Sequence, residues 1–189
     1  MGKFKFLCLT TCAFVLIFAH TAYAEKIKLN EHFYQDGNFK IGMLNPVDEP
    51  FERYKPEEMP QKIMMHVSEI GDIYLTALYL NYYRSPEAPS FWDEDAATRG
   101  AVMAAVISTD VPMDEDFGFT KLSEVDSETA DYRQKDIRYG LLVGEHTYIY
   151  AFRFIRRGGD EYILVYSGPT ADESRLSPDD FFETFALVK

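Results

Sequence analysis

The sequence predicts an α+β fold in which an antiparallel β-sheet is flanked by helices. Three observations support this class. Residues 147–166 alternate aromatic and aliphatic residues about a glycine turn, as in a β-hairpin. Residues 73–80 form a nearly continuous run of strand-forming residues, which is typical of a strand buried on both faces. Residues 91–108 and 177–185 carry the composition and the start signals of α-helices.

The first 24 residues have the layout of a secretory signal peptide. Lys3 and Lys5 precede a largely apolar run over residues 6–18, and Ala22-Tyr23-Ala24 matches a small-x-small cleavage site. The apolar run is too short for a membrane span. We therefore expect cleavage after Ala24, export to a periplasm or the extracellular space, and no membrane insertion of the mature chain.

The mature chain, residues 25–189, has the length of a single α+β domain. Both cysteines, Cys8 and Cys12, lie in the leader, so the mature fold is expected to depend on its core without disulfides. Without Lys3 and Lys5, 17 basic residues face 31 acidic ones, a net charge of −14. A surface this negative repels phosphate groups, which argues against nucleic acids and anionic membranes as partners.

The first half of the mature chain divides at turn and proline signals. Residues 25–36 show no clean period, and a turn at Gly37-Asn38 precedes a short strand from residue 39. Four prolines over residues 45–60 favour an ordered loop. Gly71-Asp72 separates two apolar blocks, which predicts a hairpin or a bulge between two strands.

The second half is expected to begin with a helix. Acidic residues followed by an alanine-rich run predict a central helix over residues 91–108, and the polar residues 120–136 favour a loop. The hairpin then turns at Gly158-Gly159-Asp160. Ser177-Pro178-Asp179-Asp180 combines a capping hydroxyl, a first-turn proline and first-turn acids, so a last helix is expected to start there with Phe181, Phe182 and Phe185 on its apolar face.

The order of these elements resembles that of the PsbP-like proteins. Residues 179–187, Asp-Asp-Phe-Phe-Glu-Thr-Phe-Ala-Leu, are similar to the Phe-Phe-x-Ser-Phe-x-Leu tail of exported bacterial members, with Thr184 in place of the usual serine. Residues 162–169 resemble their last strand and its exit. The resemblance implies an α-β-α sandwich built on an antiparallel sheet, and it transfers no catalytic residue.

Two sets of residues are candidates for ligand binding. Arg153, Arg156 and Arg157 form the tightest basic cluster in an acidic chain and could bind an anion. The alternative is a charged strand end that keeps a sheet edge in solution. Tyr148 and Tyr150 could contribute to a ligand or peptide surface if they line an open sheet face, and the alternative is a half-buried face.

Patterns for catalysis and metal binding are weak. His32, His66 and His146 lack metal-ligand spacing, and the acids at residues 110–116 do not follow the calcium-loop pattern. No nucleophile elbow or glycine-rich phosphate loop occurs in the sequence. The sequence thus predicts no catalytic residue, no metal site and no cofactor.

These observations favour an exported, non-enzymatic binding or accessory module whose partner is a protein or a small molecule. The alternative from a different class is a hydrolase or metal-dependent enzyme with a site assembled from residues scattered in the sequence.

Overall fold

A computed structural model of the chain describes residues 25–45, 47, 50–54, 62–81 and 119–188. The predicted signal peptide, the predicted helix over residues 91–108 and the acidic residues 110–116 lie outside the described residues.

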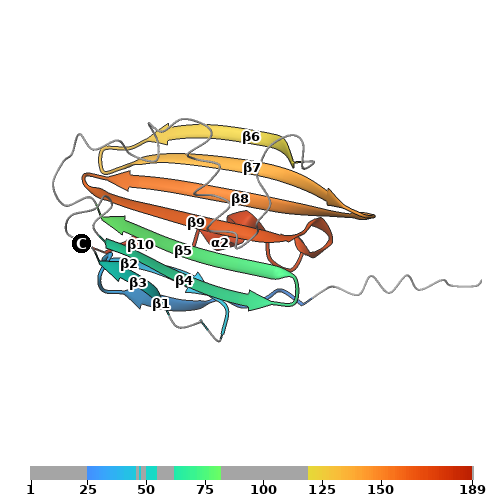
Figure 1. Cartoon of the computed structure of the whole chain (residues 1–189), viewed down its shortest axis with the longest axis horizontal. Coiled ribbons are helices and arrows are strands. Elements are labelled where there is room, and N and C mark those ends of the chain that lie inside the picture. Colours follow the sequence, from blue (N-terminus) through green and yellow to red (C-terminus); the bar gives the residue numbers. More distant parts are fainter. Residues whose placement is uncertain (1–24, 46, 48–49, 55–61, 82–118, 189) are drawn as a thin grey trace, which may run out of the picture.

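A seven-stranded antiparallel sheet forms the centre of the described structure (Figure 1). Its spatial order is β3-β4-β5-β9-β8-β7-β6. In chain order its strands are β3 (Phe51–Tyr54), β4 (Lys62–Ile70), β5 (Ile73–Asn81), β6 (Phe119–Glu128), β7 (Arg133–Val143), β8 (His146–Arg157) and β9 (Asp160–Pro169). The four central neighbours β5, β9, β8 and β7 are each nine residues long or longer, so they provide a wide surface for packing.

A second, three-stranded sheet packs on one face of the large sheet. It consists of β1 (Asn30–Tyr34), β2 (Phe39–Met43) and β10 (Ala186–Leu187), in the order β1-β2-β10. A 3₁₀ turn, η2 (Thr170–Asp172), and a short helix, α2 (Pro178–Phe182), connect β9 to β10 (Figure 1). The last described strand, β10, thereby pairs with β2, one of the first strands of the described chain.

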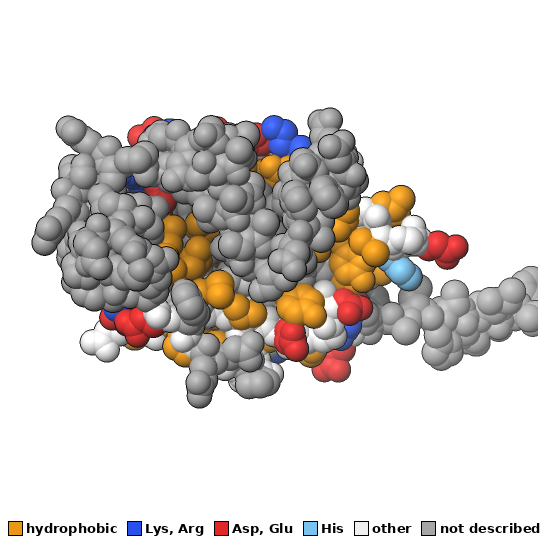
Figure 2. Space-filling model, in the orientation of Figure 1, with side chains coloured by type: hydrophobic (Ala, Val, Ile, Leu, Met, Phe, Trp, Pro, Cys, Tyr) orange, Lys and Arg blue, Asp and Glu red, His pale blue; other side chains and the backbone are white. Residues whose placement is uncertain are grey.

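Both faces of the large sheet carry buried apolar residues. On the face that meets the small sheet, side chains such as Leu75, Leu164 and Tyr166 pack with Phe39 and Phe181 in one cluster. We call this the small-sheet face. On the opposite face a second cluster is formed by residues of β5, β6, β7, β8 and β9, which are Leu78, Leu80, Phe119, Ile137, Tyr150, Phe152, Phe154, Ile163 and Val165. Figure 2 shows hydrophobic side chains on the face of the molecule that Figure 1 presents. Burial on both faces explains the nearly continuous apolar sequence of β5 and β9.

Several local predictions are confirmed. Gly71-Asp72 turns β4 into β5, with Ile70 opposite Ile73, and Gly158-Gly159 turns β8 into β9. The start of α2 is a capping box: the Ser177 hydroxyl accepts from the Asp180 backbone N–H at 3.1 Å, and the Asp180 carboxylate accepts from the Ser177 backbone N–H at 3.1 Å. These features depend on residues that are neighbours in the sequence, so the sequence pattern identifies them.

The predicted α-β-α sandwich is wrong. The described residues contain one α-helix of five residues and two antiparallel sheets, so the described chain is nearly all sheet. The layer on the small-sheet face is mainly the β1-β2-β10 sheet, because the extended segments near both ends of the described chain pair with each other. The phenylalanines expected on a last helix are divided: Phe181 and Phe182 lie in α2, whereas Phe185 follows it.

Two predicted loops contain strands, and so does a segment for which the sequence predicts no regular element. Residues 120–136 hold most of β6 and the start of β7, residues 25–36 hold β1, and residues 45–60 hold β3. The prediction failed at residues 120–136 because β6 has few apolar residues and is exposed along nearly its whole length. Pairing of its backbone with β7 makes it a strand.

Candidate functional site

The basic cluster at the end of β8 is divided between the two faces of the sheet. Side chains alternate along a strand, so Arg153 and Arg157 lie on the small-sheet face and Arg156 lies on the opposite face. β8 lies between β9 and β7, which means that the interpretation as a charged sheet edge is wrong. The three arginines therefore have to be considered separately.

Arg153 has a structural environment. Its guanidinium donates two hydrogen bonds to the Asp136 carboxylate, at 2.9 and 2.7 Å, and a third to the Phe182 carbonyl at 3.3 Å. The same group lies 4.9 Å from the centre of the Phe182 ring. A bidentate, partly buried pair of this kind is rigid. Arg153 thus joins β7, β8 and α2.

Arg156 lies beside a buried carboxylate. Its guanidinium is 3.6 Å from Glu161, whose side chain is 5% exposed, and it donates to the Gly158 carbonyl at 3.3 Å. The positive charge of Arg156 offsets the cost of burying Glu161.

The candidate tyrosines Tyr148 and Tyr150 share the opposite face with Arg156. Tyr150 is buried and packs edge-to-face on Phe119 with 5.3 Å between ring centres, and burial raises the pKa of its hydroxyl. Tyr148 is half-buried against the same cluster. The structure therefore places Tyr148, Tyr150 and Arg156 on one face and Arg153 on the other.

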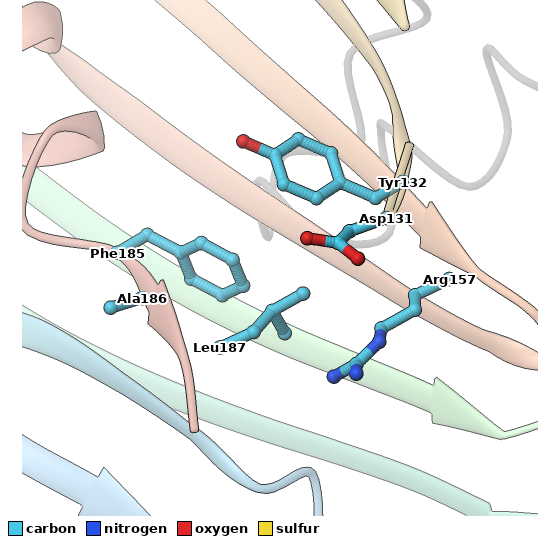
Figure 3. Close-up of a pocket in the computed structure, with 6 residues that line it drawn as sticks. All are labelled: Asp131, Tyr132, Arg157, Phe185, Ala186 and Leu187. Carbon is cyan, nitrogen blue, oxygen red and sulfur yellow. The ribbon is translucent and has the colours of Figure 1, made fainter. Parts of the chain in front are cut away.

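The third arginine, Arg157, lines a small pocket on the small-sheet face. The pocket has a volume of about 180 Å³, and its lining comes from the β6–β7 turn, the end of β8 and the C-terminal strand, namely Asp131, Tyr132, Arg157, Phe185, Ala186 and Leu187. In Figure 3 Phe185 and Leu187 lie on one side of the pocket, and Tyr132, Asp131 and Arg157 point toward them from the other. Segments far apart in the sequence thus meet here.

Local hydrogen bonds position Asp131 and Tyr132 on the polar side of the pocket. The Thr129 hydroxyl accepts from the backbone N–H groups of Asp131 and Tyr132, at 3.3 and 3.1 Å, and donates to the Tyr132 carbonyl at 3.1 Å. The Thr129 backbone N–H donates to the same carbonyl at 2.9 Å. A threonine hydroxyl bonded in this way fixes the conformation of a turn, so Asp131 and Tyr132 have defined positions.

The C-terminal segment, with Phe185 and Leu187, forms the apolar side of the pocket. The Val188 backbone N–H donates to the Asn38 backbone carbonyl at 2.9 Å, and the Asn38 side-chain amide donates to the Val188 backbone carbonyl at 2.9 Å. Phe185 packs against Phe39 and Tyr162 with ring centres 5.6 and 5.4 Å apart. The apolar side of the pocket is consequently continuous with the main core.

The charges at the pocket are not neutralised by a contact pair. Arg157 is exposed, and it forms no ion pair with any residue in the part of the chain that the structure describes. Asp160, its partner in the β8–β9 register, instead accepts hydrogen bonds from the Tyr79 hydroxyl, at 2.9 Å, and from the Asn81 amide. Among the described residues, no acidic side chain therefore neutralises Arg157.

A second group of polar side chains lies between β1 and β4. The rings of Tyr34 and His66 stack with their centres 3.7 Å apart. The ring of His32 also stacks with that of Tyr34, and their centres are 6.3 Å apart. Nε2 of both histidines and the Tyr34 hydroxyl are buried without a protein hydrogen-bond partner. Burial lowers the pKa of His66 to about 4, with His32 adding to the shift and Asp36 opposing it, and burial raises the pKa of Tyr34 to about 12.

Two further kinds of feature are absent from the residues that the structure describes. The described residues contain no group of three or more histidine, cysteine or acidic side chains placed to hold a metal ion. No helix among them has the length and hydropathy needed to cross a membrane.

Sequence reasoning identified Arg157 as part of the basic cluster and missed the rest of the pocket. Asp131 and Tyr132 were placed in a loop, and Phe185 was assigned to the core face of a helix. A possible signal was the Thr129-x-Asp131-Tyr132 sequence, since a threonine followed by an acid is typical of a side-chain-capped turn. No sequence signal links that turn to residue 157 or to residues 185–187.

No protein-family model matches the chain, and no curated protein matches it. Among solved structures, the chain is similar to cyanobacterial PsbP (CyanoP) from Synechocystis sp. PCC 6803, with a TM-score of 0.52, 14% identity, and coverage of 84% of this chain and 92% of that chain. It is also similar to PA94, a protein of unknown function from Pseudomonas aeruginosa, with a TM-score of 0.38, 12% identity, and coverage of 81% and 91%.

A third similar structure is LpqN, involved in cell envelope biogenesis of Mycobacterium tuberculosis, with a TM-score of 0.41, 8% identity, and coverage of 86% and 91%. Identities this low bear on the fold alone. The similarity to CyanoP confirms, at the level of the fold, the PsbP-like resemblance that the sequence predicts.

Proposed function

We propose that the protein is an exported, non-enzymatic accessory module that binds the carboxyl end of a partner peptide in the pocket beside Arg157. The leader pattern at residues 1–24 supports export. The function rests on one observation: a guanidinium without an ion-pair partner in the described structure lies beside the apolar side chains of Phe185 and Leu187.

The chemistry of Arg157 favours a carboxylate. A guanidinium presents parallel N–H groups that match the two oxygens of a carboxylate, and such charge-assisted hydrogen bonds are about twice as strong as neutral ones. The neighbouring apolar side chains exclude water and strengthen the attraction.

The size and the second charge of the pocket narrow the ligand class. A volume of about 180 Å³ is smaller than the roughly 300–1,000 Å³ typical of drug-sized ligand sites, so the pocket suits one terminal residue of a longer ligand. Asp131 repels a second carboxylate and accepts a hydrogen bond from an N–H group. A peptide that ends in an apolar residue supplies all three elements: a carboxylate for Arg157, an apolar side chain for Phe185 and Leu187, and an amide N–H for Asp131.

The test is an NMR titration of the isotope-labelled mature chain with acetyl-Gly-Leu, which ends in a free carboxylate. From the size of this ligand, a dissociation constant on the order of 1 mM is expected. The matched probe is acetyl-Gly-Leu amide, which lacks the negative charge, and Arg157→Gln and Arg175→Gln are the paired protein variants. Arg175 lies outside the pocket, in an i,i+3 pair with Asp172.

Arg157→Gln should weaken binding of the acid by about tenfold or more, and Arg175→Gln should leave it unchanged. Resonances of residues 131–132 and 185–187 should shift on titration. Equal binding of the acid and the amide, or an unchanged affinity in Arg157→Gln, would contradict the proposal.

A further inference from the structure

β6 is the outermost strand of the large sheet in the described structure, and it is unusually exposed. It pairs with β7 on one side, and among the described strands it has no neighbour on the other. Its ten residues comprise one buried side chain, Phe119, and nine exposed ones. Along the centre of this sheet, in β5, β8 and β9, apolar side chains are buried. Among the described residues, β6 therefore combines a long unpaired edge with exposed side chains on both faces.

The outer edge of such a strand can accept another strand. In an antiparallel pair, alternate residues direct their backbone N–H and C=O groups away from the partner, so one row of these groups on β6 faces outward. An extended segment that pairs with this row gains main-chain hydrogen bonds, and alternate side chains then determine specificity.

One face of β6 carries charge. Lys121, Glu124 and Asp126 share this face with Lys135 of β7: Lys121 and Glu124 are 2.9 Å apart, and Lys135 is 3.0 Å from Glu124 and 3.5 Å from Asp126. Glu128 lies on the same face, two residues beyond Asp126. Arg133 of β7 lies opposite Glu128 in the register. The last half of β6 itself thus carries a row of three acids, which the basic residues of β7 face from one side.

The other face carries apolar side chains. A bulge follows Lys121 in the β6–β7 register, and Leu122 lies over Gly140, where a Cβ atom on the glycine would be 3.5 Å from the leucine side chain. Leu122, Val125 and Leu142 are 54%, 59% and 66% exposed, and all three lie on the small-sheet face beyond the small sheet.

The pattern of β6 opposes pairing with a second copy of itself. Antiparallel self-pairing centred on Val125 places Glu124 opposite Asp126, and centring on Glu124 or on Asp126 places that acid opposite its own copy. Like charges directly opposite each other destabilise a sheet. A strand with basic residues at alternate positions avoids this repulsion and can also place apolar residues beside Leu122 and Val125.

We propose that the outer edge of β6 binds an extended segment of another protein in which lysine or arginine alternates with apolar residues. This surface is separate from the Arg157 pocket, and the inference does not depend on the function proposed for that pocket.

The experiment measures binding of a fluorescent ten-residue peptide of alternating lysine and valine to the mature chain by anisotropy. Two matched peptides separate the sources of binding. One has the same sequence with alternate backbone nitrogens methylated, which keeps the charge and removes the main-chain donors, and the other replaces lysine with glutamate. The unmodified lysine peptide is expected to bind at least about tenfold more tightly than either, and binding should weaken with added salt.

Protein variants locate the site. Asp126→Lys combined with Glu128→Lys should weaken binding of the lysine peptide about tenfold, whereas Asp72→Lys, at the exposed turn between β4 and β5, should not. Arg157→Gln should have no effect, which separates this test from that of the pocket. Asp126→Asn is a milder variant with an intermediate effect, and it keeps the test valid if the double variant alters folding.

Equal affinity for the methylated and unmodified peptides would assign the attraction to the acidic charge of the whole chain and would overturn the proposal. Absence of binding at millimolar peptide would do the same. Sedimentation analysis adds a third outcome: a dimer that Val125→Lys disrupts would assign the edge to a second copy of the chain.

Discussion

β9 and β6 are both ten-residue strands of the same antiparallel sheet, yet they are strands for different reasons. β9 is central and has eight consecutive buried residues, Glu161 through Gly168. β6 is at the outside and has nine exposed residues. Burial of apolar surface stabilises the first, whereas backbone pairing and cross-strand ion pairs with β7 stabilise the second. The comparison shows that burial and strand structure can be separated within one sheet.

The difference also explains which strand the sequence predicted. An apolar run such as Tyr162–Tyr166 has few alternatives to a buried strand, so the pattern of β9 is informative. The polar sequence of β6 is equally compatible with a loop. Its strand structure depends on a partner strand that follows a capped turn at Thr129.

The largest contrast is expected between substitutions at the middle of each strand. Leu164→Ala in β9 removes a fully buried side chain, at 0% exposure, and should lower the free energy of unfolding by about 2–5 kcal/mol. Val125→Thr in β6 changes a side chain that is 59% exposed and should stay within about 0.5 kcal/mol of the parent chain. Denaturant unfolding measures both. Similar losses at the two positions would show that β6 is packed more tightly than its exposure indicates.

The buried His66 should make the stability of the fold depend on pH in the acid range. Because the folded-state pKa of His66 is about 4 and the ordinary value is 6.5, the unfolded chain takes up the proton first as the pH falls. The contribution of neutral His66 to the free energy of unfolding is complete above about pH 6.5 and is lost progressively down to about pH 4. The total loss is about 3 kcal/mol.

The measurement is the free energy of unfolding at several pH values for the parent chain and for His66→Gln. Acidic groups with lowered pKa values, Glu124 and Asp180, also lose stabilisation in acid, so the difference between the two proteins isolates His66. Val125→Thr, an exposed substitution that involves no titratable group, is the control and should keep the parent's pH dependence. A His66→Gln profile parallel to that of the parent chain would contradict the assignment.

The smallest contrast concerns two glycines in strands. A Cβ atom at Gly42 of β2 would lie 2.9 Å from Leu29 and 3.0 Å from Thr184, so Gly42→Ala should cost about 1–3 kcal/mol. At Gly140 of β7 the nearest atom is Leu122 at 3.5 Å, an ordinary contact, so Gly140→Ala should be neutral or stabilising by up to about 1 kcal/mol. Thermal unfolding of both variants checks the sign at each site. A loss at Gly140 as large as that at Gly42 would show that Leu122 cannot adjust.

Prediction from the sequence succeeded where the determining residues are close together along the chain. The turns at Gly71-Asp72 and Gly158-Gly159 and the capping box at Ser177 are examples. The fold class was wrong because the helix pattern over residues 177–185 continues only to Phe182, after which the chain extends into β10. Of the candidate site, Arg157 was recognised as part of a basic cluster, but its separation from Arg153 and Arg156 required the sheet.

The sequence by itself determined the hairpins β4–β5 and β8–β9, the start of α2, and the apolar character of the central strands. The tertiary structure decided that β5 pairs with β9, that strands near the two ends of the described chain form a second sheet, and that residues 131–132, 157 and 185–187 share a pocket. The physical reason is the distance along the sequence between the residues that interact. Turns and caps depend on hydrogen bonds between residues a few positions apart, whereas strand order depends on which distant apolar faces can be buried together.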